Sequence, residues 1–248
     1  MWYTKIMNEE RYLRENIICT NKKEQEGLNQ LINDFGLDKC IEIYHNLDKL
    51  ISKEVTFKSF FNFAALDVKL SEILFTLLRH EENHVKAFLC NIFNDYQIQI
   101  EERPSNYSKN KYYFKIPIGV NEYLDIRTYN YERGSIDYYD AIKTLDFYDV
   151  NLILSHLPTH LINKFSKNPN IIMELDKTRQ LRNYVYHHNV LYSLTKENLK
   201  SSIILVLKNL PNKDLKSFYI KQINSLKSIN EEVKIYIDEY DEEEVYKY

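Results

Sequence analysis

The residues best suited to chemistry lie in one short segment late in the chain. Residues 179–192 read Arg-Gln-Leu-Arg-Asn-Tyr-Val-Tyr-His-His-Asn-Val-Leu-Tyr. On a helix, Asn183 and His187 share a face. Arg182 lies about 140° from His187 but is long enough to swing toward the same groove, although the spacing alone does not require it. A histidine can transfer a proton near neutral pH, an arginine can hold a phosphate, and an amide can orient a ribose hydroxyl. The segment therefore contains sufficient groups for RNA cleavage without a metal ion.

A second motif indicates a different chemistry, metal-dependent hydrolysis. Residues 80–84, His-Glu-Glu-Asn-His, place two imidazoles on one face of a helix, with Glu81 as the base for a zinc-bound water. Zinc peptidases of this class normally carry an uncharged residue where this chain has Glu82. A third ligand could be Glu101 or Glu102, but no second matching pattern accompanies them. We therefore predict no metal site and no cofactor, and keep zinc hydrolysis as an alternative.

The composition limits the fold and the compartment. The chain has 248 residues, 44% hydrophobic and 28% charged, which is an ordinary globular balance. With 4 Gly and 5 Pro it lacks a Gly-rich phosphate loop, and turn-rich sandwiches, propellers and barrels are disfavoured. No secretory signal and no apolar run of about 18 residues is visible, and the three cysteines form no CxxC pair. We therefore expect a cytoplasmic protein without a membrane segment.

Charge is distributed unevenly along the chain, whose net charge is −3. Residues 231–248 contain eight acidic residues and two lysines, a charge of −6, which leaves about +3 on the rest. The segment 177–200 contains five basic residues and one acidic residue. Basic surface of this kind tolerates a phosphate backbone, although charge alone favours an ordinary solvated helix face. We predict that RNA binds to four residues of this segment: Lys177, Arg179, Lys196 and Lys200.

Apolar periodicity indicates helices through most of the chain, so we predict an all-α fold. The predicted helices cover residues 8–18, 23–35 closed by Gly36, 37–51, 56–96 as one helix or two, 136–145, 150–165 with Asp149 as cap, 171–192, 196–209 capped by Thr195, and a last helix opened by Pro211. Residues 107–131 are β-rich and alternate at period two, which predicts an inserted β-hairpin. We expect three parts: an N-terminal helical segment at 1–55, a helical domain at 56–230, and the acidic tail at 231–248.

Two stretches of the chain resemble a known family. The string Arg-Asn-x-x-x-His-His-x-x-Leu-Tyr at 182–192 resembles the signature of the abortive-infection (Abi) family, which belongs to the HEPN superfamily of helical ribonucleases. Glu82, Asn83 and Lys86 resemble the Glu-Asn-x-x-Lys helix of the same proteins. The resemblance covers residues 57–96 and 138–192. The hairpin and the acidic tail are not part of the family pattern, and its N-terminal stretch is not clear in residues 1–53.

The resemblance implies a HEPN-type helical bundle and a role for each matching residue. Arg182 would stabilise the phosphate charge in the transition state, His187 would act as general acid or base, and Asn183 would position the ribose or the histidine. The implied reaction is attack of the RNA 2′-hydroxyl on its own phosphodiester, giving a 2′,3′-cyclic phosphate and a 5′-hydroxyl. The supporting residues would be Tyr186, His188, Glu82, Asn83 and Lys86.

The resemblance further implies a toxin or antiphage defence effector that works as a homodimer, with RNA as its substrate and an RNA or protein antitoxin as a further partner. DNA and membranes are not expected partners. One alternative is the same fold holding RNA or a protein without cutting it, and another is a purely structural role for the 182–187 segment. A further alternative to the dimer is that Arg79 and His84 form a second half-site within one chain.

Overall fold

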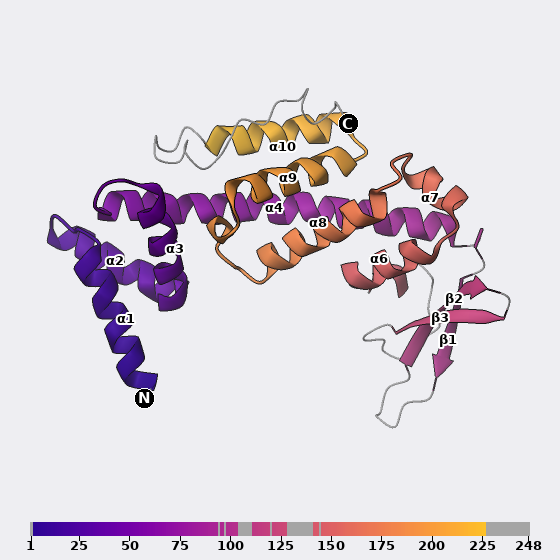
Figure 1. Cartoon of the computed structure of the whole chain (residues 1–248), viewed down its shortest axis with the longest axis horizontal. Helices are drawn as coiled ribbons and strands as arrows, with labels where there is room; N and C mark the ends of the chain where they lie inside the picture. The colour runs from indigo at the N-terminus through magenta and orange to yellow at the C-terminus, as the bar shows by residue number, and fades with distance from the viewer. Residues whose placement is uncertain are drawn as a thin grey trace. The chain divides into compact units, whose positions relative to one another are not determined.

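The protein is mostly helical, with one small antiparallel sheet. The computed structural model describes residues 2–93, 95–96, 98–103, 111–119, 121–127, 141–143 and 145–226 (Figure 1). The chain divides into two compact units, which we call the first unit (Met1–Leu77 and Arg182–Tyr248) and the second unit (Leu78–Leu181). The predicted helical character is confirmed. The acidic tail and most of the predicted helix 136–145 lie outside the described residues.

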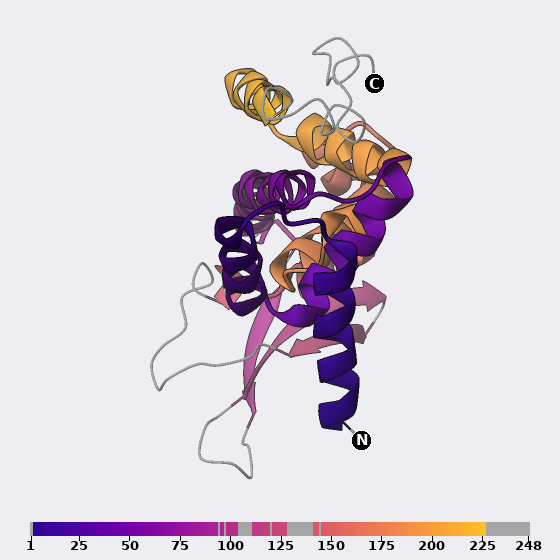
Figure 2. The same cartoon turned by 90° about the vertical axis from the view of Figure 1, so that its left-hand side faces the viewer.

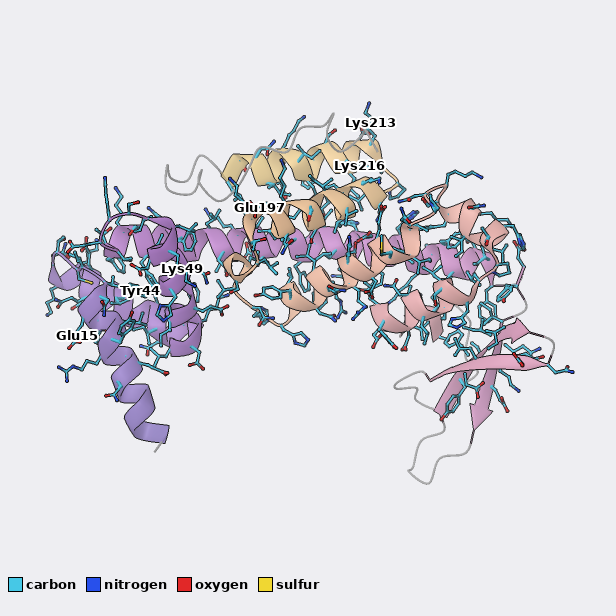
Figure 3. The ribbon with its side chains drawn as sticks, viewed as in Figure 1. Glu15, Tyr44, Lys49, Glu197, Lys213 and Lys216 are labelled. Carbon is cyan, nitrogen blue, oxygen red and sulfur yellow. The ribbon has the colours of Figure 1, made fainter. Side chains whose placement is uncertain are left out.

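Three short helices open the first unit: α1 (Trp2–Asn16), α2 (Lys22–Phe35) and α3 (Leu37–Leu50), drawn in indigo and violet in Figure 2. The side chain of Asn21 caps α2 by accepting the backbone N–H of Glu24 at 3.0 Å. Gly36 ends α2 where the sequence predicted, with φ 84°, a conformation that glycine adopts without strain. Tyr44 of α3, which is labelled in Figure 3, packs edge-on against Tyr12 with ring centroids 5.7 Å apart.

The longest element is α4 (Phe57–Ile92), a single helix of 36 residues. Of the two alternatives for residues 56–96, one continuous helix is therefore correct. Its residues up to Leu77 belong to the first unit and those from Leu78 onward to the second. Its buried side chains recur at three- and four-residue steps, as at Phe63, Leu66, Leu70, Leu74 and Leu77. None of the helices in the described part of the chain is long and apolar enough to cross a membrane.

Two further helices of the first unit, α9 (Lys196–Asn209) and α10 (Lys213–Ser225), lie side by side in Figures 1 and 2. Thr195 caps α9 as predicted. The prediction that Pro211 opens the last helix is wrong, because Asn212 is the cap and accepts the N–H groups of Asp214 and Leu215. Lys216, labelled in Figure 3, donates to the backbone oxygen of Lys208 at 2.8 Å and joins the two helices.

The sheet of the second unit has three antiparallel strands in the order β1 (Gln99–Arg103), β2 (Lys111–Gly119) and β3 (Glu122–Arg127). The predicted hairpin is confirmed as β2 and β3, but strand β1 was missed. This strand is short and carries adjacent charged residues, so its sequence has no clear period of two. Backbone pairing with β2 stabilises it, and Glu101 and Lys115 form an exposed ion pair across the two strands at 3.4 Å.

The core of the second unit joins the sheet to the helices. Phe114 and Ile116 of β2 lie on the same face of the strand, and both are fully buried. Phe114 packs edge-on against Phe93, with ring centroids 6.2 Å apart. The same cluster includes buried residues from the end of α4, the segment before α6, α6 and α8, among them Val85, Leu89, Ile142, Ile153 and Leu175.

The predicted helix 150–165 is wrong, because this stretch forms two helices, α6 (Phe147–His156) and α7 (Thr159–Phe165). Pro158 lies between them, and it lacks an N–H and disfavours helical backbone at the residue before it. The predicted cap is also wrong: the side chain of Asp146 caps α6 by accepting the N–H of Asp149 at 2.8 Å. Helix α8 (Ile171–Tyr186) begins in this unit, belongs to the first unit from Arg182 onward, and ends before the predicted boundary at Tyr192.

Candidate functional site

The C-terminal end of α8 brings Arg182, Asn183 and Tyr186 into contact. The guanidinium of Arg182 lies over the ring of Tyr186, with its central carbon 4.0 Å from the ring centroid. Arg182 also donates to the amide oxygen of Asn183 at 3.3 Å. A cation–π contact and a hydrogen bond together restrict an otherwise flexible side chain. The predicted catalytic residues Arg182 and Asn183 therefore contact each other, and Arg182 also contacts the predicted supporting residue Tyr186.

His187 and His188 follow immediately, in the turn that ends α8. His187 donates its backbone N–H to the carbonyl of Asn183 at 3.0 Å, so the backbone is still helical there, and its side chain is exposed. The next two N–H groups, of His188 and Asn189, bond to the carbonyls of Val185 and Tyr184. This is the Schellman pattern, in which the residue at the position of His188 is left-handed. His188 indeed has φ 55°, although glycine is the usual residue in this position.

Replacing His188 with glycine is expected to raise the free energy of unfolding by about 1 kcal/mol, because glycine adopts the left-handed conformation without the clash of a Cβ atom. Urea unfolding measures the change. The matched control is His187→Gly one residue earlier, where the backbone is helical and glycine should lower stability by about 1 kcal/mol. A His188→Gly variant that is less stable than the wild type would show that the imidazole itself holds the turn.

Asp67 of α4 fixes the segment that follows this turn, a role that no local sequence pattern indicates. Its carboxylate is fully buried and accepts the backbone N–H of Leu191 at 2.8 Å, at the start of the short 3₁₀ helix η1 (Leu191–Ser193). Lys39 of α3 lies 3.1 Å from the other carboxylate oxygen. Burial raises the pKa of Asp67, and Lys39 and the Leu191 N–H oppose that shift. Asp67 is therefore a positioning residue for the chain after His188.

Phe75 is a second residue of the site that sequence reasoning missed. Its ring stacks on that of Tyr186, with centroids 4.4 Å apart and planes inclined by 24°. Phe75 is 40% exposed. Arg182, Tyr186 and Phe75 therefore form one continuous arrangement of a cation and two aromatic rings, which we call the stacking platform. Exposed aromatic rings beside an arginine are typical of surfaces on which unpaired bases stack.

The residues Glu82 and Lys86, predicted to support catalysis, form an ion pair in the second unit. Lys86 Nζ lies 2.8 Å from a Glu82 carboxylate oxygen, and both side chains are only about a tenth exposed. Lys86 also donates to the backbone carbonyl of Lys143 at 3.2 Å. This arrangement joins α4 to the segment before α6, which is a structural role. Asn83, the third residue of that motif, is exposed.

The His-Glu-x-x-His motif does not assemble a metal centre among the described residues. No group of three or more His, Cys, Asp or Glu side chains in that part of the chain could hold a metal ion. Glu81, which would activate a zinc-bound water, is fully buried, and Thr178 donates to it at 3.5 Å. The ring of His84 packs on Phe165, and burial lowers the pKa of that histidine. Glu101 and Glu102, the two candidates for a third ligand, both lie in strand β1.

The four predicted RNA-binding residues belong to two different elements. Lys177 and Arg179 are on α8 in the second unit, where Lys177 is exposed and Arg179 bonds to Asp176 at 2.8 Å. Lys196 and Lys200 are on α9 in the first unit and are half-buried. Comparisons of the chain with family models, with curated proteins and with solved structures found no match.

Proposed function

We propose that the protein is an endoribonuclease of the HEPN type that cleaves RNA without a metal ion or cofactor. The observation that carries the proposal is the end of α8, where Asn183 and Tyr186 hold the guanidinium of Arg182 and an exposed histidine, His187, follows in the terminating turn. This combination offers an oriented cation for a phosphate and an accessible group that can move a proton. The resemblance of this segment to the Abi signature supports the same reading.

In the proposed mechanism, the RNA supplies its own nucleophile. The 2′-hydroxyl attacks the adjacent phosphorus and loses its proton, the bond to the 5′-oxygen breaks, and that oxygen gains a proton. His187 accepts or donates one of these protons, and Arg182 stabilises the charge that grows on the phosphoryl oxygens. Asn183, whose amide oxygen accepts from Arg182, keeps the guanidinium oriented. The products are a 2′,3′-cyclic phosphate and a 5′-hydroxyl.

The stacking platform supports RNA as the substrate. A base unpaired from its strand can stack on an exposed ring such as Phe75, which orients the neighbouring phosphodiester toward Arg182. The platform is also compatible with the second candidate, a module that binds RNA without cutting it, because stacking alone requires no proton transfer. In the cell, we propose a toxin or antiphage defence effector restrained by an antitoxin.

One experiment separates the candidates: purified protein and its His187→Ala variant are incubated with total RNA in EDTA. Cleavage that survives EDTA and is lost in the variant supports the metal-independent ribonuclease. Binding without cleavage by either protein would favour the non-catalytic module. Cleavage abolished by EDTA would favour a metal-dependent hydrolase instead.

We further propose that the active protein is a homodimer in which two α8 ends share one groove. A single α8 end offers one Arg182 and one His187, whereas acid–base chemistry on a phosphodiester needs a donor and an acceptor on opposite sides of phosphorus. A two-fold contact duplicates the set, and isologous dimers are the commonest closed assembly.

Light scattering is expected to give twice the chain mass of 29.9 kDa for the active species. Mixing wild-type chains with an excess of His187→Ala chains should lower the activity per wild-type chain, because a mixed dimer retains only one His187 and so lacks the second acid–base group. A strictly monomeric protein that cleaves RNA at nanomolar concentration would contradict the shared groove.

A further inference from the structure

A pocket of about 520 Å³ opens within the second unit, and its walls come from α6, α8 and the turn before α8. This volume lies within the range of small-molecule sites in proteins. Apolar side chains supply part of the wall, and the polar groups among them are few: the apolar residues include Leu152, Ile172 and Met173, and the polar ones include Tyr148, Asn151 and Asp176. Such a wall suits a flat, largely apolar ligand with hydrogen-bonding edges.

Asn151 of α6 is the unusual residue of this pocket. It is 7% exposed, and neither its amide oxygen nor its amide nitrogen has a hydrogen-bond partner within the part of the chain that the structure describes. A buried amide with both groups unsatisfied destabilises a fold, so native proteins seldom retain one that serves no purpose. Asn151 is also one of the residues that line the pocket, so a bound group would lie against this residue. The ligand that satisfies Asn151 must offer an acceptor and a donor side by side.

From these observations we infer that the pocket binds an adenine nucleotide, with Asn151 bonded to the edge of the base. Adenine presents a donor beside an acceptor on both of its hydrogen-bonding edges, and asparagine pairs with it in a bidentate manner. Tyr148 lines the pocket and is 55% exposed, and its ring offers a surface on which the base can stack. Ile172 and Met173 provide apolar contact for the other parts of the base.

The rim of the pocket fits the rest of the nucleotide. Arg179 bonds to Asp176 at 2.8 Å, and its guanidinium lies 5.6 Å from the centroid of the Tyr148 ring. Two pocket residues therefore hold Arg179 in place while it retains further N–H groups for a phosphate. The hydrogen bond from Arg179 lowers the pKa of Asp176, which stays a carboxylate and can accept from a ribose hydroxyl. In this site, the partner of Arg179 is the phosphate of the bound nucleotide. The sequence analysis predicted only that Arg179 contacts RNA.

The nucleotide can come from two sources, a free mononucleotide or one unpaired adenosine of an RNA strand, and the pocket chemistry is the same for both. The inference goes beyond the proposed cleavage and does not depend on it, because Arg182 and His187 take no part in the pocket. Binding is therefore measured with the full-length His187→Ala chain, which leaves the RNA probe intact whether or not the wild type cuts it.

The test is fluorescence anisotropy with labelled hexamers of adenosine and of uridine, followed by competition with AMP. The adenosine hexamer is expected to bind about tenfold more tightly than the uridine hexamer. Adding Asn151→Leu should remove this preference and leave the melting temperature equal or higher, because the unsatisfied amide is gone. The matched control, Asn163→Leu on the exposed face of α7, should change neither quantity.

A second variant, Tyr148→Leu, should weaken binding of the adenosine hexamer without lowering the melting temperature, since its ring is largely exposed. Displacement of the hexamer by AMP would support the inference and identify a free nucleotide as the ligand of the pocket. If AMP fails to displace the hexamer while Asn151→Leu and Tyr148→Leu still have their expected effects, the inference is supported with an RNA adenosine as the ligand. Equal binding of the two hexamers, or an Asn151→Leu chain that binds adenosine like its parent, would overturn the inference.

Discussion

Replacing Arg182 or His187 with alanine is expected to lower the rate of RNA cleavage at least about a hundredfold while the fold is retained. General acid–base catalysis contributes about 10²–10⁴ to a rate, and one group that stabilises developing charge contributes about 10²–10³. His187 is exposed in the turn that ends α8, so its removal leaves no cavity. Initial rates on a labelled RNA, measured in EDTA beside thermal melts, give both quantities.

Two further variants make this result specific. Arg182→Lys keeps the charge but loses the planar fork that lies on Tyr186 and bonds to Asn183, so its rate should stay well below that of the wild type. His160→Ala removes an exposed histidine of α7, outside the proposed site, and should leave the rate unchanged. Full activity in both alanine variants at positions 182 and 187 would show that the site is assigned to the wrong residues.

The second large effect is expected at Asp67. Its replacement by alanine should lower the free energy of unfolding by about 3–5 kcal/mol, because it leaves the amine of Lys39 and the N–H of Leu191 without their buried partner. Urea unfolding gives the loss in stability. Hydrogen exchange at the Leu191 amide should accelerate, which reports directly on the segment after His188.

The control for this prediction is Asp67→Asn, which keeps an acceptor for Leu191 but removes the charge. Burial raises the pKa of Asp67, so the charged form is disfavoured inside the fold relative to the unfolded chain. A neutral amide avoids that penalty, and Asp67→Asn should therefore lose much less stability than Asp67→Ala. Equal losses in the two variants would mean that the ion pair with Lys39, rather than the bond to Leu191, holds this segment.

Local signals predicted some element ends and missed others, since Asp146 and Asn212 cap their helices where Asp149 and Pro211 had been predicted to begin them. Thr195 and Gly36 act on their own neighbours, so α9 and the end of α2 are readable from the sequence. Strand β1 could not be predicted from its own residues, because it is held by its backbone pairing with β2. Pro158 is a local signal for a helix break, but the apolar periodicity on both sides of it favoured one continuous helix.

The candidate site likewise contains residues that could be predicted from the sequence and residues that could not. The residues of the 182–188 string are neighbours in the chain, so their proximity could be predicted. Asp67 lies 124 residues from Leu191, and Phe75 is likewise far from Tyr186, so only the fold brings these pairs together. The end of α8 at Tyr186 depends on a left-handed histidine, which has no sequence signal as clear as that of glycine.

The central claim is tested most directly by the chemical ends of RNA cut by the purified protein in the presence of EDTA. Attack by the 2′-hydroxyl leaves a 2′,3′-cyclic phosphate on one fragment and a 5′-hydroxyl on the other. A 5′-hydroxyl accepts phosphate from a polynucleotide kinase without prior treatment, and a cyclic phosphate blocks 3′-ligation until it is opened. We predict these two ends from the wild type and no cut RNA from the His187→Ala variant. Fragments with 5′-phosphate and 3′-hydroxyl ends, produced equally by both proteins, would contradict the account.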